Sequence, residues 1–203
     1  LEGIGSGAVS NPVSDVQYAE VIFVIGSNTT VNHPVAATFM KNAVERGAKL
    51  ILADPRRTEL ARFATHVLQF KPGSDVALLN AMLHVIVTEG LVDEDFIAER
   101  TEGYDELRRR IIAYSPEAMA PICGIDAETI REAARLYATS KGSMIFWGMG
   151  VSQHVHGTDN ARALIALALT TGQIGRRGTG LDPLRGQNNG QGGTDGVLMP
   201  MCY

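Results

Sequence analysis

The sequence predicts an α/β fold built on a doubly wound, mostly parallel β-sheet with helices on both faces. Short, wholly apolar and β-branched runs recur along the chain, as in strands that are covered on both faces. Segments with helical periodicity alternate with these runs. The 203 residues are 45% hydrophobic and 20% charged, which provides enough apolar side chains for a core. We therefore expect a Rossmann-like αβα arrangement.

Four apolar runs predict the strands of this sheet. They read VIFVIG, KLILAD, HVLQF and SMIFWG and cover residues 21–26, 49–54, 66–70 and 143–148. Each run is short, and most end at a Gly or an Asp, residues that favour turns over strands. These features favour parallel strands joined by helical connections.

Helices are predicted between and after the strands. Pro34 suits the first position of a helix that ends near Gly47. Ser74 suits the cap of a helix that runs to about Glu89 and stops at Gly90. This helix is apolar nearly all round, so we expect it to be central. The other helices are expected at 93–100, 104–113, 126–139 and 158–171, with a further helix start at 115–117, and those between about 91 and 140 form a helical insert.

Composition excludes several classes of protein. A net charge of −4 argues against a general surface for nucleic acid or anionic membranes. No apolar run is long enough for a membrane span, and the first residues lack a signal-peptide pattern. Cys123 and Cys202, the two cysteines, form neither a disulfide framework nor a metal-binding set. We expect no metal ligands in this chain and take the cytoplasm as its default location.

The last stretch of the chain has an unusual composition. DPLRGQNNGQGGTDG begins at Asp182 and contains Gly, Asn and Gln but a single cation, Arg185. Composition alone fits a flexible linker. After the last strand–helix unit, it fits a loop whose glycines let the backbone pass close to a bulky ligand. We expect one domain over residues 1–181 and a Gly/Asn/Gln-rich loop over 182–203 that leads to a further domain of a longer polypeptide.

Small or polar residues follow each of the four predicted strands. In open α/β sheets, ligands bind beyond the carboxyl ends of the strands, so these residues are candidates for one crevice. Backbone N–H groups at the start of a helix favour an anion such as a pyrophosphate, and a carboxylate after the second strand suits a ribose hydroxyl. The candidates are Gly26, Ser27 and Asn28; Asp54, Pro55 and Arg56; Gly73, Ser74 and Asp75; and Met149, Gly150 and Gln153.

Several of these residues also have structural interpretations. Ser27, Asn28 and Ser74 are common turn and cap residues. Asp54 is suited to cap the short helix that follows it, and Arg56 to be a solvated surface charge. The first strand–helix turn lacks G-x-G-x-x-G, which disfavours NAD(P) and leaves another nucleotide open.

Three histidines are not predicted as metal ligands. His154 and His156 have the spacing of a metal pair, but the chain lacks a fuller ligand set beside them, so no metal site is expected there. His84 lies within an apolar helix and is expected to be a satisfied core histidine.

Six stretches together resemble the molybdopterin oxidoreductase family, and most closely the catalytic subunits of molybdenum-dependent formate dehydrogenases. They read VIGSNTTVNHP, GAKLILADPRRTELA, KPGSDVALLNAMLHVI, RTEGYDEL, WGMGVSQH and ALTTGQIGRRGTGLDPLRGQNNGQG. The resemblance covers essentially the whole chain and rests on the order and spacing of the stretches. LRGQNN favours formate dehydrogenase over nitrate reductase.

The resemblance implies a cofactor of one molybdenum held by two molybdopterin guanine dinucleotides, one of which this region binds. The residues after the first strand would line a phosphate or pterin turn. Those after the second and third strands would meet the guanosine end, and Met149, Gly150 and Gln153 a pterin and phosphate turn. Arg185 would hold the formate carboxylate through two parallel N–H···O bonds, with Gln187 as a neighbouring polar contact.

The resemblance also implies partners and missing parts. Arg185 would position formate while its C–H bond breaks at the oxidised metal and carbon dioxide leaves. The Cys or selenocysteine metal ligand and an iron–sulfur cluster would lie before Leu1, and the second pterin's domain further downstream. The remaining domains and an electron-transfer subunit are expected partners, with no nucleic acid and no direct membrane insertion. Two alternatives stay open: another bis-pterin molybdenum or tungsten oxidoreductase, and a non-catalytic guanine-nucleotide-binding module.

Overall fold

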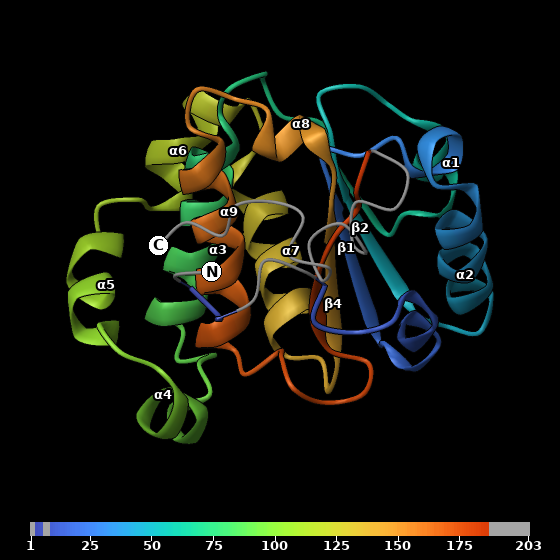
Figure 1. Ribbon diagram of the computed structural model, residues 1–203. Coiled ribbons are helices and arrows are strands. Elements are labelled where there is room, and N and C mark those ends of the chain that lie inside the picture. The colour runs from blue at the N-terminus through green and yellow to red at the C-terminus, as the bar shows by residue number, and fades with distance from the viewer. Residues whose placement is uncertain (1–2, 6–8, 187–203) are drawn as a thin grey trace.

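A five-stranded parallel sheet forms the centre of the part of the chain that the computed structural model describes, residues 3–5 and 9–186 (Figure 1). The strand order is β3-β2-β1-β4-β5, and every neighbouring pair is parallel. Helices cover both faces, which confirms the predicted α/β class. The strands are β1 (Val21–Ile25), β2 (Lys49–Ala53), β3 (His66–Leu68), β4 (Ser143–Trp147) and β5 (Gly180–Pro183).

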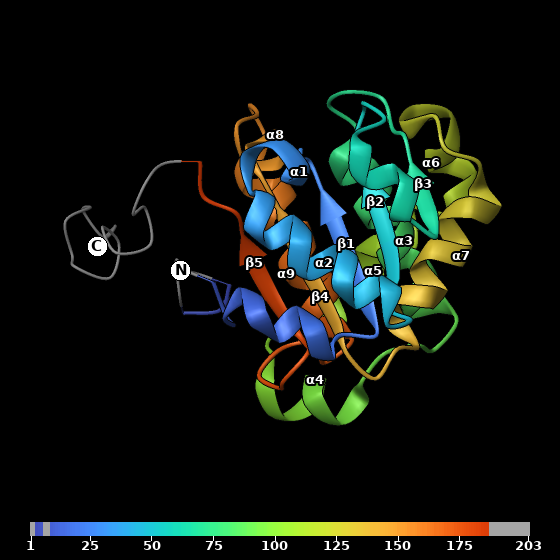
Figure 2. The same ribbon diagram turned by 90° about the vertical axis from the view of Figure 1, so that its right-hand side faces the viewer.

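The two faces of the sheet carry different layers of helices (Figures 1 and 2). One face is covered by η1 (Val13–Tyr18), α2 (Pro34–Glu45) and η2 (Glu59–Phe63), and α1 (Thr29–Asn32) precedes α2. The other face is covered by α3 (Asp75–Thr88), α7 (Ala127–Ala138) and α9 (Gly157–Thr170). The remaining helices are α4 (Glu94–Arg100), α5 (Tyr104–Ile111), α6 (Pro116–Cys123) and α8 (Met149–Ser152). Within the described ranges, no helix has the length and apolar content that a bilayer span requires.

Successive side chains of β1 point to opposite faces of the sheet, and both faces are buried, which explains why its sequence is apolar throughout. Phe23 and Ile25 pack into the core under α3, whereas Ile22 and Val24 pack into the core under α2. A strand with two buried faces has no position for a polar side chain. Each core removes apolar surface from water, so the sheet is stabilised from both sides.

The central position predicted for α3 is confirmed. Eight of its residues are buried, and it contacts α5, α6, α7 and α9. Ser74 occupies the cap position of α3, but its hydroxyl donates to the Lys71 carbonyl (2.6 Å) and accepts no bond from a helix N–H. The expected side-chain cap is therefore wrong at this helix. It is present at α6, where the Ser115 hydroxyl accepts from the Ala118 N–H (3.3 Å).

The fifth strand was not predicted. Asp182 and Pro183, expected at the start of the glycine-rich loop, belong to β5, which pairs with β4 from Met144–Gly180 to Trp147–Pro183. Gly, Asp and Pro all have low strand propensity. They are tolerated because β5 is an edge strand, and the backbone groups on its outer side make no hydrogen bonds to another strand.

Asp182 is a buried carboxyl group on this edge strand, with 2% of its surface exposed. Burial raises the pKa of Asp182 to about 7; the backbone N–H of Asn11 acts in the opposite direction, and the Asp15 carboxylate raises the pKa further. The protonated form is thus favoured in the folded state over most of the acidic range.

We expect Asp182→Asn to remove a pH-dependent loss of stability. The folded state binds the Asp182 proton more tightly than the unfolded state does, so the protonated group stabilises the folded chain below about pH 4. This stabilisation is lost as the pH rises toward 7. The free energy of unfolding should fall by at most about 1.4 kcal/mol per pH unit over this range. The amide does not ionise, so the variant's free energy of unfolding should change less over this range.

Urea denaturation at pH 5 and pH 7 measures the difference between the wild-type chain and the variant. Glu99→Gln, which neutralises an exposed carboxylate on α4, serves as the control. The same pH dependence in wild type and Asp182→Asn would show that Asp182 does not titrate in this range.

Candidate functional site

A cavity of about 420 Å³ opens at the carboxyl ends of β1, β2 and β4, at the end of the sheet where α1 and α8 lie (Figure 1). This is the position that the parallel topology predicts for a ligand. The residues that line it are Gly26, Ser27, Asn28, Asn32, His33, Asp54, Pro55, Arg56, Phe70, Pro72, Gly73, Asp75, Gly148, Met149, Gly150, His154, Leu184 and Gly186.

The turns after β1 and β4 cross in direct backbone contact at this cavity. The Gly150 N–H donates to the Gly26 carbonyl oxygen (3.1 Å). A Cβ on Gly150 would lie 2.6 Å from that oxygen, and a Cβ on Gly148 would lie 2.8 Å from it. Gly26 itself has φ +58° and lies under the Val151 backbone. Only residues without a Cβ allow this crossing, which brings the two turns to one wall.

Neutral polar groups follow β1. Ser27 is buried, and its Oγ accepts from the Thr29 hydroxyl (3.2 Å). Asn28 Oδ1 accepts from the Thr30 hydroxyl (3.2 Å), and the side-chain amide nitrogen of Asn28 is a donor by its chemistry. This wall therefore offers hydroxyl and amide donors without a formal charge.

A carboxylate follows β2. Asp54 has 4% of its surface exposed, and its Oδ1 accepts from the Arg56 N–H (2.8 Å). The guanidinium of Arg56 lies 3.6 Å from the same oxygen, and its side chain is 74% exposed. Asp54 does not cap η2, whose cap position is Thr58, so that alternative is wrong. The carboxylate instead closes the turn that forms the cavity wall.

A second buried carboxylate stands at the first residue of α3. Asp75 is 2% exposed, and its Oδ1 has no hydrogen-bond partner in the described part of the chain. Burial raises the pKa of Asp75, its own backbone N–H and His154 lower it, and Asp54 raises it. A buried oxygen without a donor is costly, so a ligand N–H or O–H at this point would stabilise the ionised form.

Ten of the twelve candidates after the strands line this one cavity. Ser74 does not, since its hydroxyl is bound to Lys71, and neither does Gln153, an exposed residue after α8. Gln187 lies outside the described residues. Whether the ten residues bind a ligand stays a prediction.

Arg185 lies between two residues that line the cavity, Leu184 and Gly186. Its carbonyl oxygen is 2.7 Å from Nε2 of His33. His33 and His154 both line the cavity, although neither was among the candidates. His154 matches the corresponding turn of the family only loosely, so the resemblance gave no signal for a site there. His33 directly precedes the predicted helix start at Pro34, which is a signal for a turn and not for a site.

No group of three or more His, Cys, Asp and Glu residues within 3–5 and 9–186 is placed to hold a metal ion. His84, as expected, is tied into the protein: its Nδ1 lies 3.0 Å from the Ile111 carbonyl oxygen.

Comparison with known proteins gives the same assignment as the motifs. Residues 3–199 match the molybdopterin oxidoreductase family. The chain belongs to this family. The family implies a molybdenum or tungsten pterin cofactor.

The relatives include formate dehydrogenases and nitrate reductases. The chain is 47% identical over 199 residues to the F420-dependent formate dehydrogenase subunit alpha of Methanocaldococcus jannaschii, covering 98% of this chain and 30% of that protein. It is 44% identical over 202 residues to formate dehydrogenase H of Escherichia coli, covering 100% and 28%. Identity to the assimilatory nitrate reductase catalytic subunit of Bacillus subtilis is 34%, covering 91% and 26%.

A solved structure supports the fold. Acetylene hydratase from Pelobacter acetylenicus superposes with a TM-score of 0.75 at 30% identity, covering 83% of this chain and 25% of that one. The chain thus spans 30% or less of the length of the relatives named above.

We expect Gly150→Ala to destabilise the chain by about 1–3 kcal/mol, because the new methyl group would overlap the Gly26 carbonyl oxygen. Gly186→Ala is the matched control: its Cβ would meet Met149 at an ordinary 3.6 Å, and a change below about 0.5 kcal/mol is expected. Chemical denaturation of the two variants checks this. Equal stability of both would show that the turns do not need to cross as closely as described.

Proposed function

We propose that this chain is part of a formate dehydrogenase and that its cavity holds one guanine dinucleotide limb of a bis-pterin molybdenum cofactor. One observation carries the proposal: the cavity has neutral donors after β1 and two buried carboxylates at β2 and α3. The chain around it is 44–47% identical to formate dehydrogenase subunits.

The carboxylates fit the guanosine end of this group. Guanine presents an N1–H and an amino group side by side, and both can donate to one carboxylate. Asp75 has an oxygen without a partner among the described residues, which such donors would satisfy. Asp54 is suited to accept from ribose hydroxyls, and His154 favours the ionised form of Asp75.

The neutral wall fits the phosphate and pterin part. Ser27 and Asn28 offer a hydroxyl and an amide, and the glycine crossing lets backbone N–H groups come close to a bulky ligand. Gly73, Met149 and Gly150 complete the lining. Neutral N–H and O–H donors can bind a diphosphate, so this wall does not need a positively charged side chain for that purpose.

Arg185 would bind the substrate. Its planar guanidinium can hold formate through two parallel N–H···O bonds, and it stays protonated, so it positions the carboxylate and transfers no proton. Gln187 is proposed as a neighbouring polar contact. The bound pterin–metal group would supply the acceptor of the electrons released when the C–H bond breaks.

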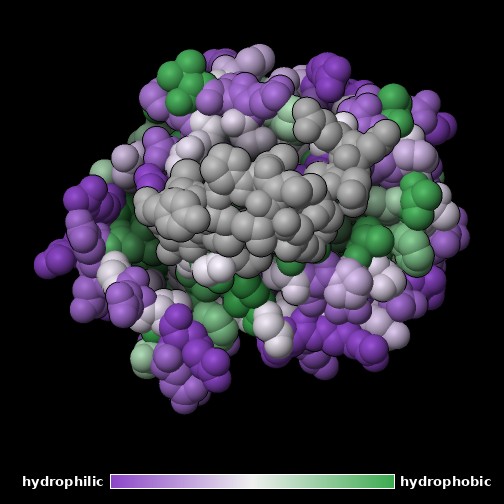
Figure 3. Space-filling view, viewed as in Figure 1, coloured by the Kyte–Doolittle hydropathy of each residue, from purple (hydrophilic) through white to green (hydrophobic). Residues whose placement is uncertain are grey.

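The exposed apolar residues near this end of the sheet fit contact with the rest of a longer enzyme. Val31, Val35 and Val155 are 66%, 68% and 97% exposed. Hydrophobic side chains interrupt the polar surface at several places in Figure 3. We propose that further domains of the enzyme, and an electron-transfer subunit beyond them, complete the site.

A nitrate reductase-like enzyme is the second candidate, since the chain is 34% and 36% identical to two nitrate reductases. The higher identity to formate dehydrogenases and the LRGQNN stretch favour formate.

The test uses the full-length enzyme that contains this chain. We expect formate-dependent reduction of a viologen dye, and a loss of about 10²–10³ in kcat/KM for Arg185→Lys, because a point charge does not reproduce the two-pronged contact. Metal content should stay close to wild type.

Arg57→Lys is the matched control, because Arg57 is exposed and does not line the cavity. Oxidation of the reduced dye by nitrate, with no reaction of formate, would favour the second candidate. Wild-type formate turnover in Arg185→Lys would remove Arg185 from the active site.

A further inference from the structure

We propose that His33 is a positioning residue for Arg185. Its imidazole Nε2 donates to the Arg185 carbonyl oxygen at 2.7 Å and so holds the segment that carries the guanidinium beside the cavity. The inference rests on the proposed function, in which Arg185 binds formate.

The two helices on either side of His33 position its backbone. It lies between α1 and α2, and Pro34 at the first position of α2 fixes the backbone that follows it. A carbonyl oxygen only accepts hydrogen bonds, so Nε2 carries the hydrogen in this contact. The other ring nitrogen, Nδ1, is buried and has no partner among the residues described. Among the described residues, the contact with Arg185 is thus the hydrogen bond that the His33 ring makes.

Contacts of different kinds locate the segment from Leu184 to Gly186. The Leu184 N–H donates to the Trp147 carbonyl oxygen (2.8 Å), and the Leu184 side chain packs against the core under α2. The contact from His33 is a hydrogen bond made by a side chain. A substitution at His33 can therefore remove it and leave the backbone bond of Leu184 in place.

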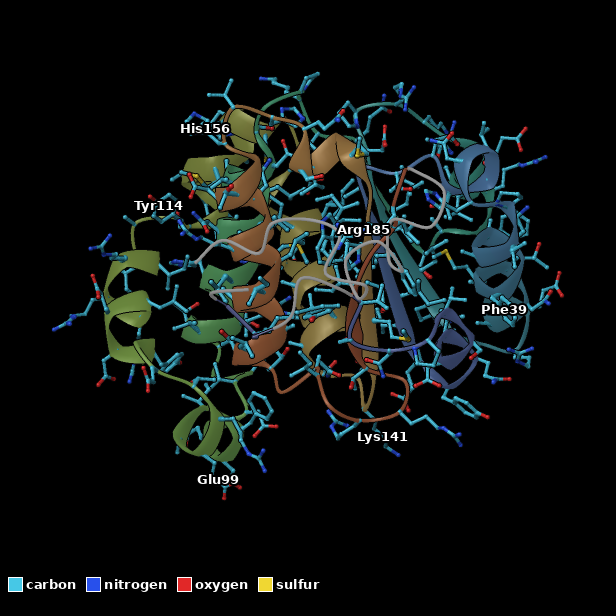
Figure 4. The ribbon with its side chains drawn as sticks, in the orientation of Figure 1. Phe39, Glu99, Tyr114, Lys141, His156 and Arg185 are labelled. Carbon is cyan, nitrogen blue, oxygen red and sulfur yellow. The ribbon has the colours of Figure 1, made fainter. Side chains whose placement is uncertain are left out.

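The hydrogen bond from His33 is made to Arg185, the residue proposed to bind formate. Arg185 stands just beyond the end of β5 (Figure 4), where the sheet no longer fixes the chain. A carbonyl held from α1–α2 limits rotation of the Arg185 backbone and hence the direction of its side chain. Displacement of a substrate-binding group by about 1 Å can cost about 10²-fold in rate.

Two variants of the full-length enzyme separate the bond from the shape of the side chain. The Gln carboxamide nitrogen reaches about as far as Nε2, whereas that of Asn reaches only as far as Nδ1. We expect His33→Asn to lower kcat/KM for formate by about ten- to a hundredfold. His33→Gln should retain most of the activity. His156→Asn, at an exposed histidine outside the cavity, is the control.

Two further readouts distinguish positioning from general stability. In a double-mutant cycle, the effect of His33→Asn should largely disappear in the Arg185→Lys background, because His33 acts through Arg185. Hydrogen–deuterium exchange of a peptide that covers residues 184–186 should be faster in His33→Asn than in wild type, and unchanged in His33→Gln. The exchange measurement does not depend on turnover.

Equal losses in the Asn and Gln variants, additive effects in the cycle, or unchanged exchange in His33→Asn would each overturn the inference. If His33→Asn does not fold with its metal, the Gln variant decides: near wild-type kcat/KM and exchange support the inference, and a loss in either contradicts it. If the wild-type enzyme does not oxidise formate, the proposed function fails, and the exchange result still decides whether His33 holds the segment.

Discussion

The parallel register of the three central strands sets the position of the whole site. Ile25 pairs with Ala53 on one side and with Trp147 on the other, so β1, β2 and β4 end at one level of the sheet. The turns that follow must then share the same space. They can do so because Gly26, Gly148 and Gly150 bring backbone against backbone where a Cβ would collide.

Because these turns meet on one wall, the cavity has a neutral part and an acidic part. The turns after β1 and β4 contribute glycines, the Ser27 hydroxyl and the Asn28 amide, while Asp54 and Asp75 lie at the ends of β2 and α3. The carboxylates are buried at some electrostatic cost, seen in the raised pKa of Asp75. Paired N–H donors of a ligand at this end would compensate this cost, which supports the proposed guanine dinucleotide.

The sequence was enough to predict β1 to β4, the central α3 and most of the cavity lining, because each depends on a local pattern and on the common edge of a parallel sheet. It did not predict β5, whose Gly-Leu-Asp-Pro residues form a strand only because β4 offers them a ladder. Nor did it predict His33, since its partner Arg185 lies 152 residues away and the contact exists only in the folded chain. Ser74 shows a third limit: a suitable cap residue took a competing acceptor, Lys71.

The location of the nucleotide in the full-length enzyme tests the central claim most directly. A crystal or cryo-EM structure with cofactor bound should show a guanine base with its N1–H and amino group directed at a carboxylate of this cavity, Asp75 or Asp54. It should also show the diphosphate beside the turns after β1 and β4. A guanine bound away from both carboxylates, or a cavity filled by another part of the polypeptide, would contradict the account.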